Sequence, residues 1–187
     1  VGALSFFDAN NDGWLDLINQ SAYGVPELRI FEPGIGFVHT RDAVLENAHN
    51  TPPGSLAADF DNDGWTDLYM TQAAWFSAGP NRMFRNLRGE GWEDVSLGGD
   101  QALSTQNSCG VSTLDFDHDG LLDIAVTGTA GGTLRLLRNL GDFVFEDVSD
   151  TAGLLPITAT AVGLAIGDVN DDGWDDIYVN SFEPPYG

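Results

Sequence analysis

Residues 59–67 read Asp-Phe-Asp-Asn-Asp-Gly-Trp-Thr-Asp, and three other stretches of the chain follow the same nine-residue pattern, D-x-[D/N]-x-D-G-x-x-D. The four copies begin at Asp8, Asp59, Asp115 and Asp168, so consecutive copies lie 51, 56 and 53 residues apart. A nearly constant period of this length is typical of a repeat architecture. We refer to these stretches as the first to fourth acidic loops and number their positions 1 to 9.

Short apolar runs surround each acidic loop in a constant order. One run precedes the loop and one follows it. Two more come after a variable stretch, at 83–86 and 92–95 in the second copy and at 134–137 and 143–145 in the third. Turn residues separate the runs, and no helical period of useful length is present. Four short strands in each period predict an all-β chain, a β-propeller of four-stranded blades.

The repeats form a single array without a separate domain. Their expected boundaries are 1–50, 51–106, 107–159 and an incomplete 160–187. These repeats give three full blades and half of a fourth, whereas propellers contain four to eight blades. We therefore expect the chain to be part of a larger ring, completed by remaining blades of the same protein or by self-assembly.

The acidic loops have the composition of calcium sites. Calcium takes six to eight oxygen ligands, and alternating positions 1, 3 and 5 turn three side-chain oxygens inward. Glycine at position 6 permits the sharp turn, position 7 offers its backbone carbonyl, and Asp at position 9 closes the site. The pattern predicts up to four Ca²⁺ ions, one for each loop. The predicted ligands are Asp8, Asn10, Asp12, Trp14 and Asp16; Asp59, Asp61, Asp63, Trp65 and Asp67; Asp115, Asp117, Asp119, Leu121 and Asp123; and Asp168, Asn170, Asp172, Trp174 and Asp176.

The charge of the chain agrees with bound cations. The chain has 29 acidic and 7 basic residues, for a formal charge of −22, and 14 of the acidic residues stand at predicted ligand positions. Packing several carboxylates into nine residues costs free energy that a divalent ion reverses. The alternative is a set of metal-free Asx-turns. An EF-hand is excluded because position 12 carries no Glu, and magnesium disfavours all-protein cages.

Composition also excludes several partners. Nucleic acid needs basic patches, and an anionic membrane repels this charge. No run of about 18 apolar residues is present, so we expect no membrane insertion. The single cysteine, Cys109, allows no internal disulfide, and we expect it to be a buried hydrophobic residue. No phosphate loop, nucleophile elbow or Ser/His/Asp arrangement is present.

The motifs together resemble FG-GAP/VCBS-type repeats of integrin-α-like β-propellers. The resemblance rests on the acidic loops, on Asn-Arg-Met-Phe-Arg-Asn at 81–86 with Trp-Glu-Asp-Val-Ser at 92–96, and on their counterparts at 137–142 and 145–148. It implies a propeller, usually seven-bladed, with calcium between the first two strands of each blade. Such repeats occur in adhesion proteins, in lectins and in accessory domains of secreted enzymes. The first repeat departs from the pattern at 31–34.

We therefore expect a non-catalytic module, extracellular or at the cell surface, for adhesion, assembly or glycan or protein recognition, with calcium in a structural role. The alternative is an accessory or catalytic segment of a secreted carbohydrate-active hydrolase or lyase. A protein or glycan partner is expected at the face opposite the calcium loops, where Tyr23, Trp75 and Phe76 are the ligand candidates. These aromatic residues could instead cover blade edges.

Three further side-chain types have structural interpretations. The tryptophans at position 7 share one phase and are expected to pack between blades. His118, at position 4 of the third loop, is expected to point away from an ion. Arg85-Asn86 and Arg138-Asn139 are expected to bond a neighbouring turn.

Overall fold

The computed structural model describes residues 3–20, 24–48, 54–72, 80–96, 108–128, 134–154 and 160–182. The ligand candidates Tyr23, Trp75 and Phe76 lie outside these ranges, so the recognition face remains a prediction. Within the described residues the chain forms β-strands and one short helix, which confirms the all-β prediction. No helix in this part of the chain is long and apolar enough to cross a membrane.

The strands form four antiparallel sheets in which neighbours in sequence are neighbours in space. The first sheet contains β1 (Ala3–Phe7), β2 (Asp16–Gln20), β3 (Pro26–Glu32) and β4 (Gly36–Thr40). The second contains β5 (Ser55–Ala58), β6 (Asp67–Met70), β7 (Arg82–Asn86) and β8 (Trp92–Asp94). The third contains β9 (Ser108–Leu114), β10 (Asp123–Gly128), β11 (Arg135–Asn139) and β12 (Phe145–Asp147). The fourth contains β13 (Thr160–Gly167) and β14 (Asp176–Phe182).

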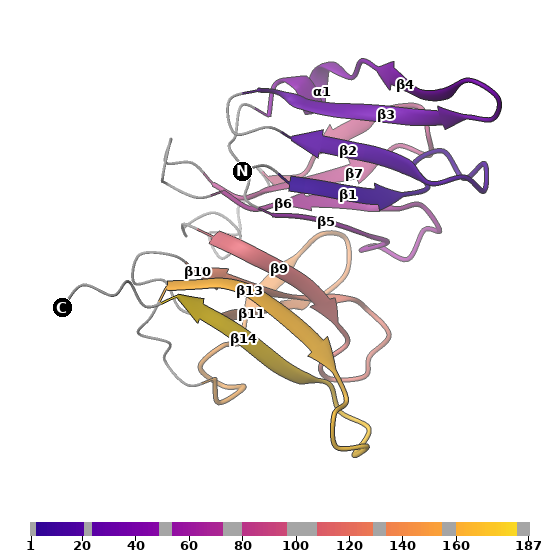
Figure 1. The fold of residues 1–187 in the computed structure, drawn as a ribbon. Helices are drawn as coiled ribbons and strands as arrows, with labels where there is room; N and C mark the ends of the chain where they lie inside the picture. The colour runs from indigo at the N-terminus through magenta and orange to yellow at the C-terminus, as the bar shows by residue number, and fades with distance from the viewer. Residues whose placement is uncertain are drawn as a thin grey trace.

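Each acidic loop joins the first two strands of its sheet in the same register. The residue before the loop pairs with the Asp at position 9, as Ala58 does with Asp67 and Leu114 with Asp123. The same register occurs in the first and fourth sheets. All four loops consequently lie along one edge of the molecule, at the right of Figure 1.

Apolar side chains from adjacent sheets form the cores. Between the second and third sheets, Phe60, Tyr69 and Met83 pack with Ile124 and Phe145, all of them buried. Comparable cores contain residues of the first and second sheets and of the third and fourth. Strands alternate in side-chain direction, so one face of a sheet meets the preceding sheet and the other meets the next.

First strands of neighbouring sheets approach closely at glycines. A Cβ atom on Gly54 would lie 2.3 Å from the Cys109 carbonyl oxygen, and one on Gly110 would lie 2.9 Å from the Cα of Gly163. Both distances are below van der Waals contact, so only glycine permits this approach. Cys109 itself is buried, as expected, and burial raises the pKa of its thiol.

Two features differ from the sequence-based expectation. A single helical turn, α1 (Ala43–Glu46), follows β4. The Asp42 carboxylate caps it by accepting from the amides of Val44 and Leu45. It is too short to give a periodic signal, but it buries Leu45 in the first core. The last strand of the third sheet begins at Phe145 rather than at residue 143, because Asp142 and Phe143 adopt positive φ in the turn.

Candidate metal centres

One hydrogen-bond network is repeated in all four acidic loops. In the second loop the Asp59 carboxylate accepts from the amides of Asp63 (3.1 Å) and Gly64 (2.8 Å), and the Asp63 carboxylate accepts from the amide of Trp65 (3.0 Å). The same three bonds occur in the other loops. Glycine at position 6 adopts φ of 87–88° in each loop, which explains its invariance among the four copies. The loops thus contain Asx-turns, and these turns orient the carboxylates.

The aspartate at position 9 fastens the loop to the sheet. Asp67 is fully buried; one of its oxygens accepts from the Phe60 amide (3.0 Å) and the other from the Asn86 amide (2.9 Å). Asp16 and Asp123 make the same pair of bonds in the first and third sheets. A carboxylate with two acceptor atoms is needed here, because each oxygen satisfies a different backbone amide.

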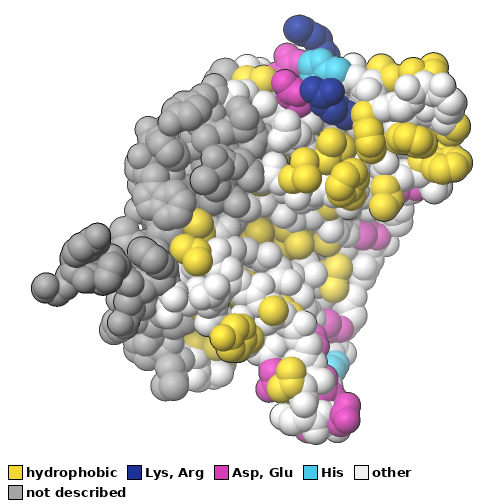
Figure 2. Space-filling view, viewed as in Figure 1, with side chains coloured by type: hydrophobic (Ala, Val, Ile, Leu, Met, Phe, Trp, Pro, Cys, Tyr) yellow, Lys and Arg dark blue, Asp and Glu magenta, His cyan; other side chains and the backbone are white. Residues whose placement is uncertain are grey.

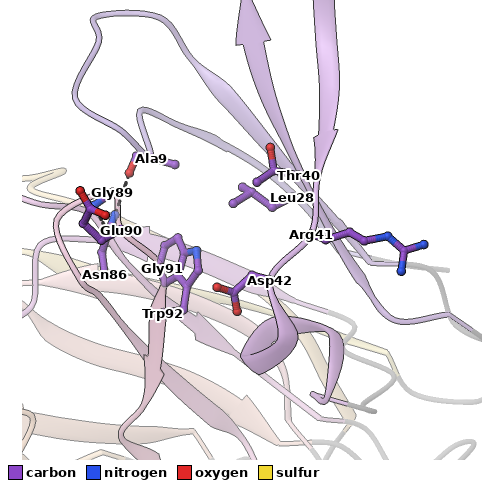
Figure 3. A pocket seen from close by; sticks show the side chains of 10 residues that line it. All are labelled: Ala9, Leu28, Thr40, Arg41, Asp42, Asn86, Gly89, Glu90, Gly91 and Trp92. Atoms are coloured by element: carbon purple, nitrogen blue, oxygen red, sulfur yellow. Dashed lines mark hydrogen bonds between the residues drawn. The ribbon is translucent and has the colours of Figure 1, made fainter.

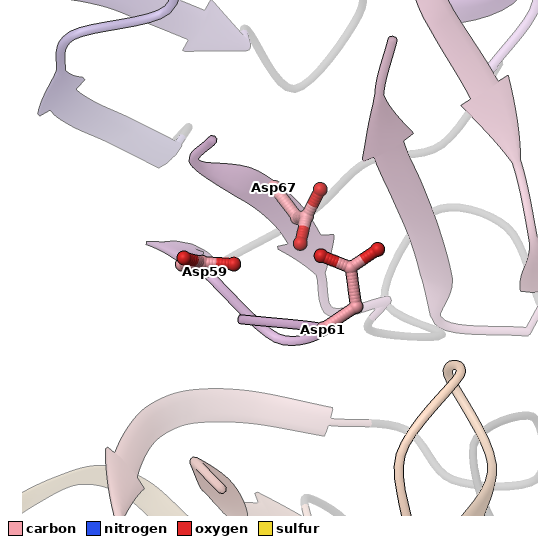
Figure 4. Close-up of side chains that lie close together, drawn as sticks. All are labelled: Asp59, Asp61 and Asp67. Atoms are coloured by element: carbon pink, nitrogen blue, oxygen red, sulfur yellow. The ribbon is translucent and has the colours of Figure 1, made fainter. Parts of the chain in front are cut away.

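Carboxylates converge in the second and third loops. Ligand atoms of Asp59, Asp61 and Asp67 all lie within 4.8 Å of one another, and the equivalent atoms of the third loop do so as well. Figure 4 shows the side chains of Asp61 and Asp67 directed toward one another, with Asp59 to their left. In the third loop the buried Oδ1 of Asp117 has no hydrogen-bond partner. Hard oxygen donors and an unsatisfied carboxylate oxygen fit a calcium ion.

Burial raises the pKa of three of the converging carboxyl groups, Asp61, Asp67 and Asp123. Desolvation is the main cause for Asp67, whose pKa rises to about 7 although two backbone amides oppose the change. Desolvation also raises the pKa of Asp61, with the neighbouring Asp63 charge as the next contributor, and the pKa of Asp123. The second and third loops therefore hold negative charge that water does not fully solvate, and a divalent cation would favour the ionised forms.

Two arginines that the sequence reasoning treated as structural reach into the loops. Arg85 on β7 places Nη2 2.7 Å from Oδ2 of Asp61, and Arg138 on β11 places Nη2 2.6 Å from Oδ2 of Asp117. Each guanidinium also lies within 4.0 Å of the position-5 carboxylate. The repeated Arg-Asn pair at the end of these strands is the sequence signal for this contact. That the arginine reaches the position-3 aspartate follows only from the register of β7 against β6.

The asparagines that follow these arginines behave as predicted. The Asn86 amide donates to the Ala9 carbonyl of the preceding loop (2.9 Å) and to the Thr66 carbonyl of its own loop (3.1 Å). Asn139 makes the equivalent bonds, to Phe60 and Leu122. Each asparagine therefore ties two consecutive acidic loops together.

Position-4 residues form a second link between loops. Asn11 donates to the Gly64 carbonyl and Asn62 donates to the Gly120 carbonyl, both at 3.0 Å. His118 is exposed, as expected, and its ring lies 4.3 Å from that of Trp174, centroid to centroid, in the next loop. Trp174 therefore contacts the preceding repeat but is 54% exposed. Trp14 instead lies against Phe31 of its own sheet and is 50% exposed.

A small crevice of about 130 Å³ lies at the first junction. Figure 3 shows Leu28 and Asp42 of the first repeat on the side of Trp92 of the second, whereas the Arg41 side chain points away. Asp42 serves as the helix cap there, so the crevice reflects packing around α1 rather than a set of converging reactive groups.

A protein-family comparison agrees with the repeat geometry. Residues 59–126 and 115–179 match the family model described as FG-GAP-like repeat. Each matched stretch begins at position 1 of an acidic loop and ends in the strand that follows an acidic loop. This chain belongs to the FG-GAP-like repeat family. The first acidic loop lies before the matched residues but makes the same hydrogen bonds.

Curated relatives include cartilage acidic protein 1. The chain is 31% identical over 130 residues to that protein from Mus musculus and 30% identical to that from Homo sapiens. The match covers 66% of this chain and 20% of each relative. The chain therefore spans about a fifth of the length of the curated relatives that it matches.

Proposed function

We propose that this FG-GAP-like chain is a calcium-stabilised, non-catalytic module of an extracellular or cell-surface β-propeller. The observation that carries the proposal is the repetition of one loop geometry in four sheets, with carboxylate clusters within 4.8 Å in two of them. In the proposal, side chains at positions 1, 3, 5 and 9 and the carbonyl at position 7 hold up to four Ca²⁺ ions. The role of the ion is structural, because it neutralises carboxylates at the turn between two strands.

The exposed face of the first sheet supports a larger array. Phe37 pairs with Phe31 as Trp92 pairs with Asn86 and Phe145 with Asn139. Trp92 and Phe145 are buried against the preceding sheet, whereas Phe37 is 43% exposed. Figure 2 shows hydrophobic side chains gathered over this sheet at the upper right, and Leu4 and Phe6 are exposed there too. We infer that a further repeat covers this face.

Recognition is proposed at the face opposite the calcium loops. The acidic loops occupy one edge, and their hydrogen bonds hold the scaffold rather than a ligand. A protein or a glycan would then contact the opposite loops, which include Tyr23, Trp75 and Phe76. Binding of a glycan array or of candidate proteins by the unmodified chain, but not by the W75A/F76A variant, would support this assignment.

Calcium removal tests the central proposal. We expect the melting temperature to fall after EDTA treatment and to recover with CaCl₂ but not with the same concentration of MgCl₂. Each site that binds only the folded state adds about 2.7 kcal/mol of stability at a calcium concentration of about 100 Kd. The Asp59→Asn variant should show a smaller recovery, and Asp142→Asn, outside the loops, is the control. Identical melting curves with and without calcium would refute a structural role.

A further inference from the structure

The second and third acidic loops differ from the first in two correlated ways. Position 3 is Asp61 or Asp117 in these loops but Asn10 in the first. In the second sheet Leu68 pairs with Phe84 on β7, and the next residue of that strand is Arg85. In the first sheet the equivalent residue Leu17 pairs with Arg29 on β3, and the next residue is Ile30. Among the residues that the structure describes, no arginine pairs with a carboxylate of the first loop.

The correlation equalises the charge of the loops. The first loop has three aspartates at positions 1, 3, 5 and 9, and no paired guanidinium. The second and third loops have four aspartates and one arginine against position 3, so all three loops have a net charge of −3. Arg88 contacts Asp63 as well, at 3.5 Å, but it is far more exposed than Arg85.

The Arg85 guanidinium is fixed from two sides. It lies 2.7 Å from Asp61, whose side chain is 6% exposed, and 5.7 Å from the ring centroid of Phe143 in the next repeat. A cation held over an aromatic ring and against a buried carboxylate stays close to the loop. It therefore occupies an oxygen of position 3 and repels an entering cation.

We propose that Arg85 and Arg138 are internal counter-cations that lower the calcium affinity of the second and third loops and stabilise them without calcium. The inference rests on the proposed calcium function. The loops thus reach the same net charge by different routes: the first has one carboxylate fewer, whereas the second and third have a fourth carboxylate that an arginine of their own repeat offsets.

Amide resonances of the position-6 glycines report each loop separately. In a calcium titration of the ¹⁵N-labelled chain, Gly64 reports the second loop and Gly13 the first, because each donates to the position-1 aspartate. We expect Arg85→Gln to lower the calcium midpoint of Gly64 roughly five- to tenfold while the midpoint of Gly13 stays unchanged. The melting temperature in EDTA should fall. Arg29→Gln is the matched control, since Arg29 is also 39% exposed and pairs with Glu27 instead of a loop.

A second variant covers the case in which Arg85→Gln does not fold. Asp61→Asn removes one carboxylate from the second loop and keeps Arg85, so it should raise the calcium midpoint of the Gly64 resonance. The double variant D61N/R85Q gives the second loop the same side chains at positions 1, 3, 5 and 9 as the first loop, without Arg85, and should bring the calcium midpoint of Gly64 close to that of Gly13. A Gly64 midpoint that is unchanged or raised in the arginine variant, or a double variant that behaves like D61N, would overturn the inference alone. If the glycine amide resonances of the unmodified chain do not shift when calcium is added, both this inference and the proposed function are overturned.

Discussion

Asp67 shows how one side chain can serve both the fold and a cation. Its two oxygens accept from amides in its own loop and on β7, which joins the turn to the third strand. One of its oxygens also belongs to the carboxylate cluster with Asp59 and Asp61. The buried charge is therefore costly in the ion-free protein, and the fold tolerates it because the same group satisfies two backbone donors.

A pH dependence follows for the calcium-free protein. Burial raises the pKa of Asp67 to about 7, so the folded state retains a proton that the unfolded state loses above its ordinary pKa of 3.8. The stability from this proton is present at low pH and is lost as the pH rises toward 7. Glu27 and Asp168 have lowered pKa values and act in the opposite sense only near and below pH 4.

We therefore expect a higher urea midpoint at pH 5.5 than at pH 8 in EDTA. The Asp67→Asn variant should lose most of this difference, and saturating calcium should reduce it by favouring the carboxylate. Stability that increases between pH 5.5 and pH 8 in EDTA would contradict the prediction.

The residue scale also shows what sequence could and could not predict. The repeated spacing identified the candidate ligands, because alternate residues in a turn share a side. Spacing alone did not show that Arg85 and Arg138 meet position 3, since that contact depends on the register between two strands. The Asn86 and Asn139 links between loops were expected from their repetition, although their acceptors were not.

At the scale of elements, first strands meet along a line of glycines. Gly54 lies against the Cys109 backbone, and Gly110 lies against Gly163. Backbone atoms cannot rotate away as a flexible side chain can, so an added methyl group must displace a strand. These glycines consequently set the spacing between sheets.

Gly54→Ala should lower the free energy of unfolding by about 1–3 kcal/mol. Gly167→Ala, in the first strand of the fourth sheet, is the control, because its Cβ would meet no atom within 4 Å. Chemical denaturation at constant calcium measures both. Equal stability of the two variants would show that the strands separate without cost.

Strands were more predictable than their ends. Alternating apolar runs gave their number and order, since each run buries one face against a neighbouring sheet. The start of β12 was misplaced by two residues because positive φ at Asp142 and Phe143 extends the turn. The helix α1 was missed because one turn capped by Asp42 leaves no periodic pattern.

At the scale of the whole molecule, the charge of −22 opposes folding. All seven basic residues are arginines, and three of them, Arg85, Arg88 and Arg138, contact acidic loops. The remaining carboxylates repel one another over distances comparable to the Debye length, which falls from about 30 Å at 0.01 M salt to about 3 Å at 1 M.

Sodium chloride should therefore stabilise the calcium-free protein. We expect its melting temperature to rise by several degrees between about 0.01 M and 0.5 M NaCl, and to rise less when calcium is saturating, because bound ions have already reduced the net charge. Scanning calorimetry at both calcium levels gives the comparison. An equal salt effect with and without calcium would show that the loops are not the main source of repulsion.

The position-4 contacts give the row of acidic loops a polarity. Asn11 of one loop donates to position 6 of the next, and Asn62 repeats this one repeat later, so every such bond runs from the earlier repeat to the later one. The glycine at position 6 of the receiving loop also donates its amide to the position-1 aspartate of the same loop. An ordered second loop therefore presents both the acceptor for the first loop and the donor for the third, so these two bonds couple the first three loops in sequence.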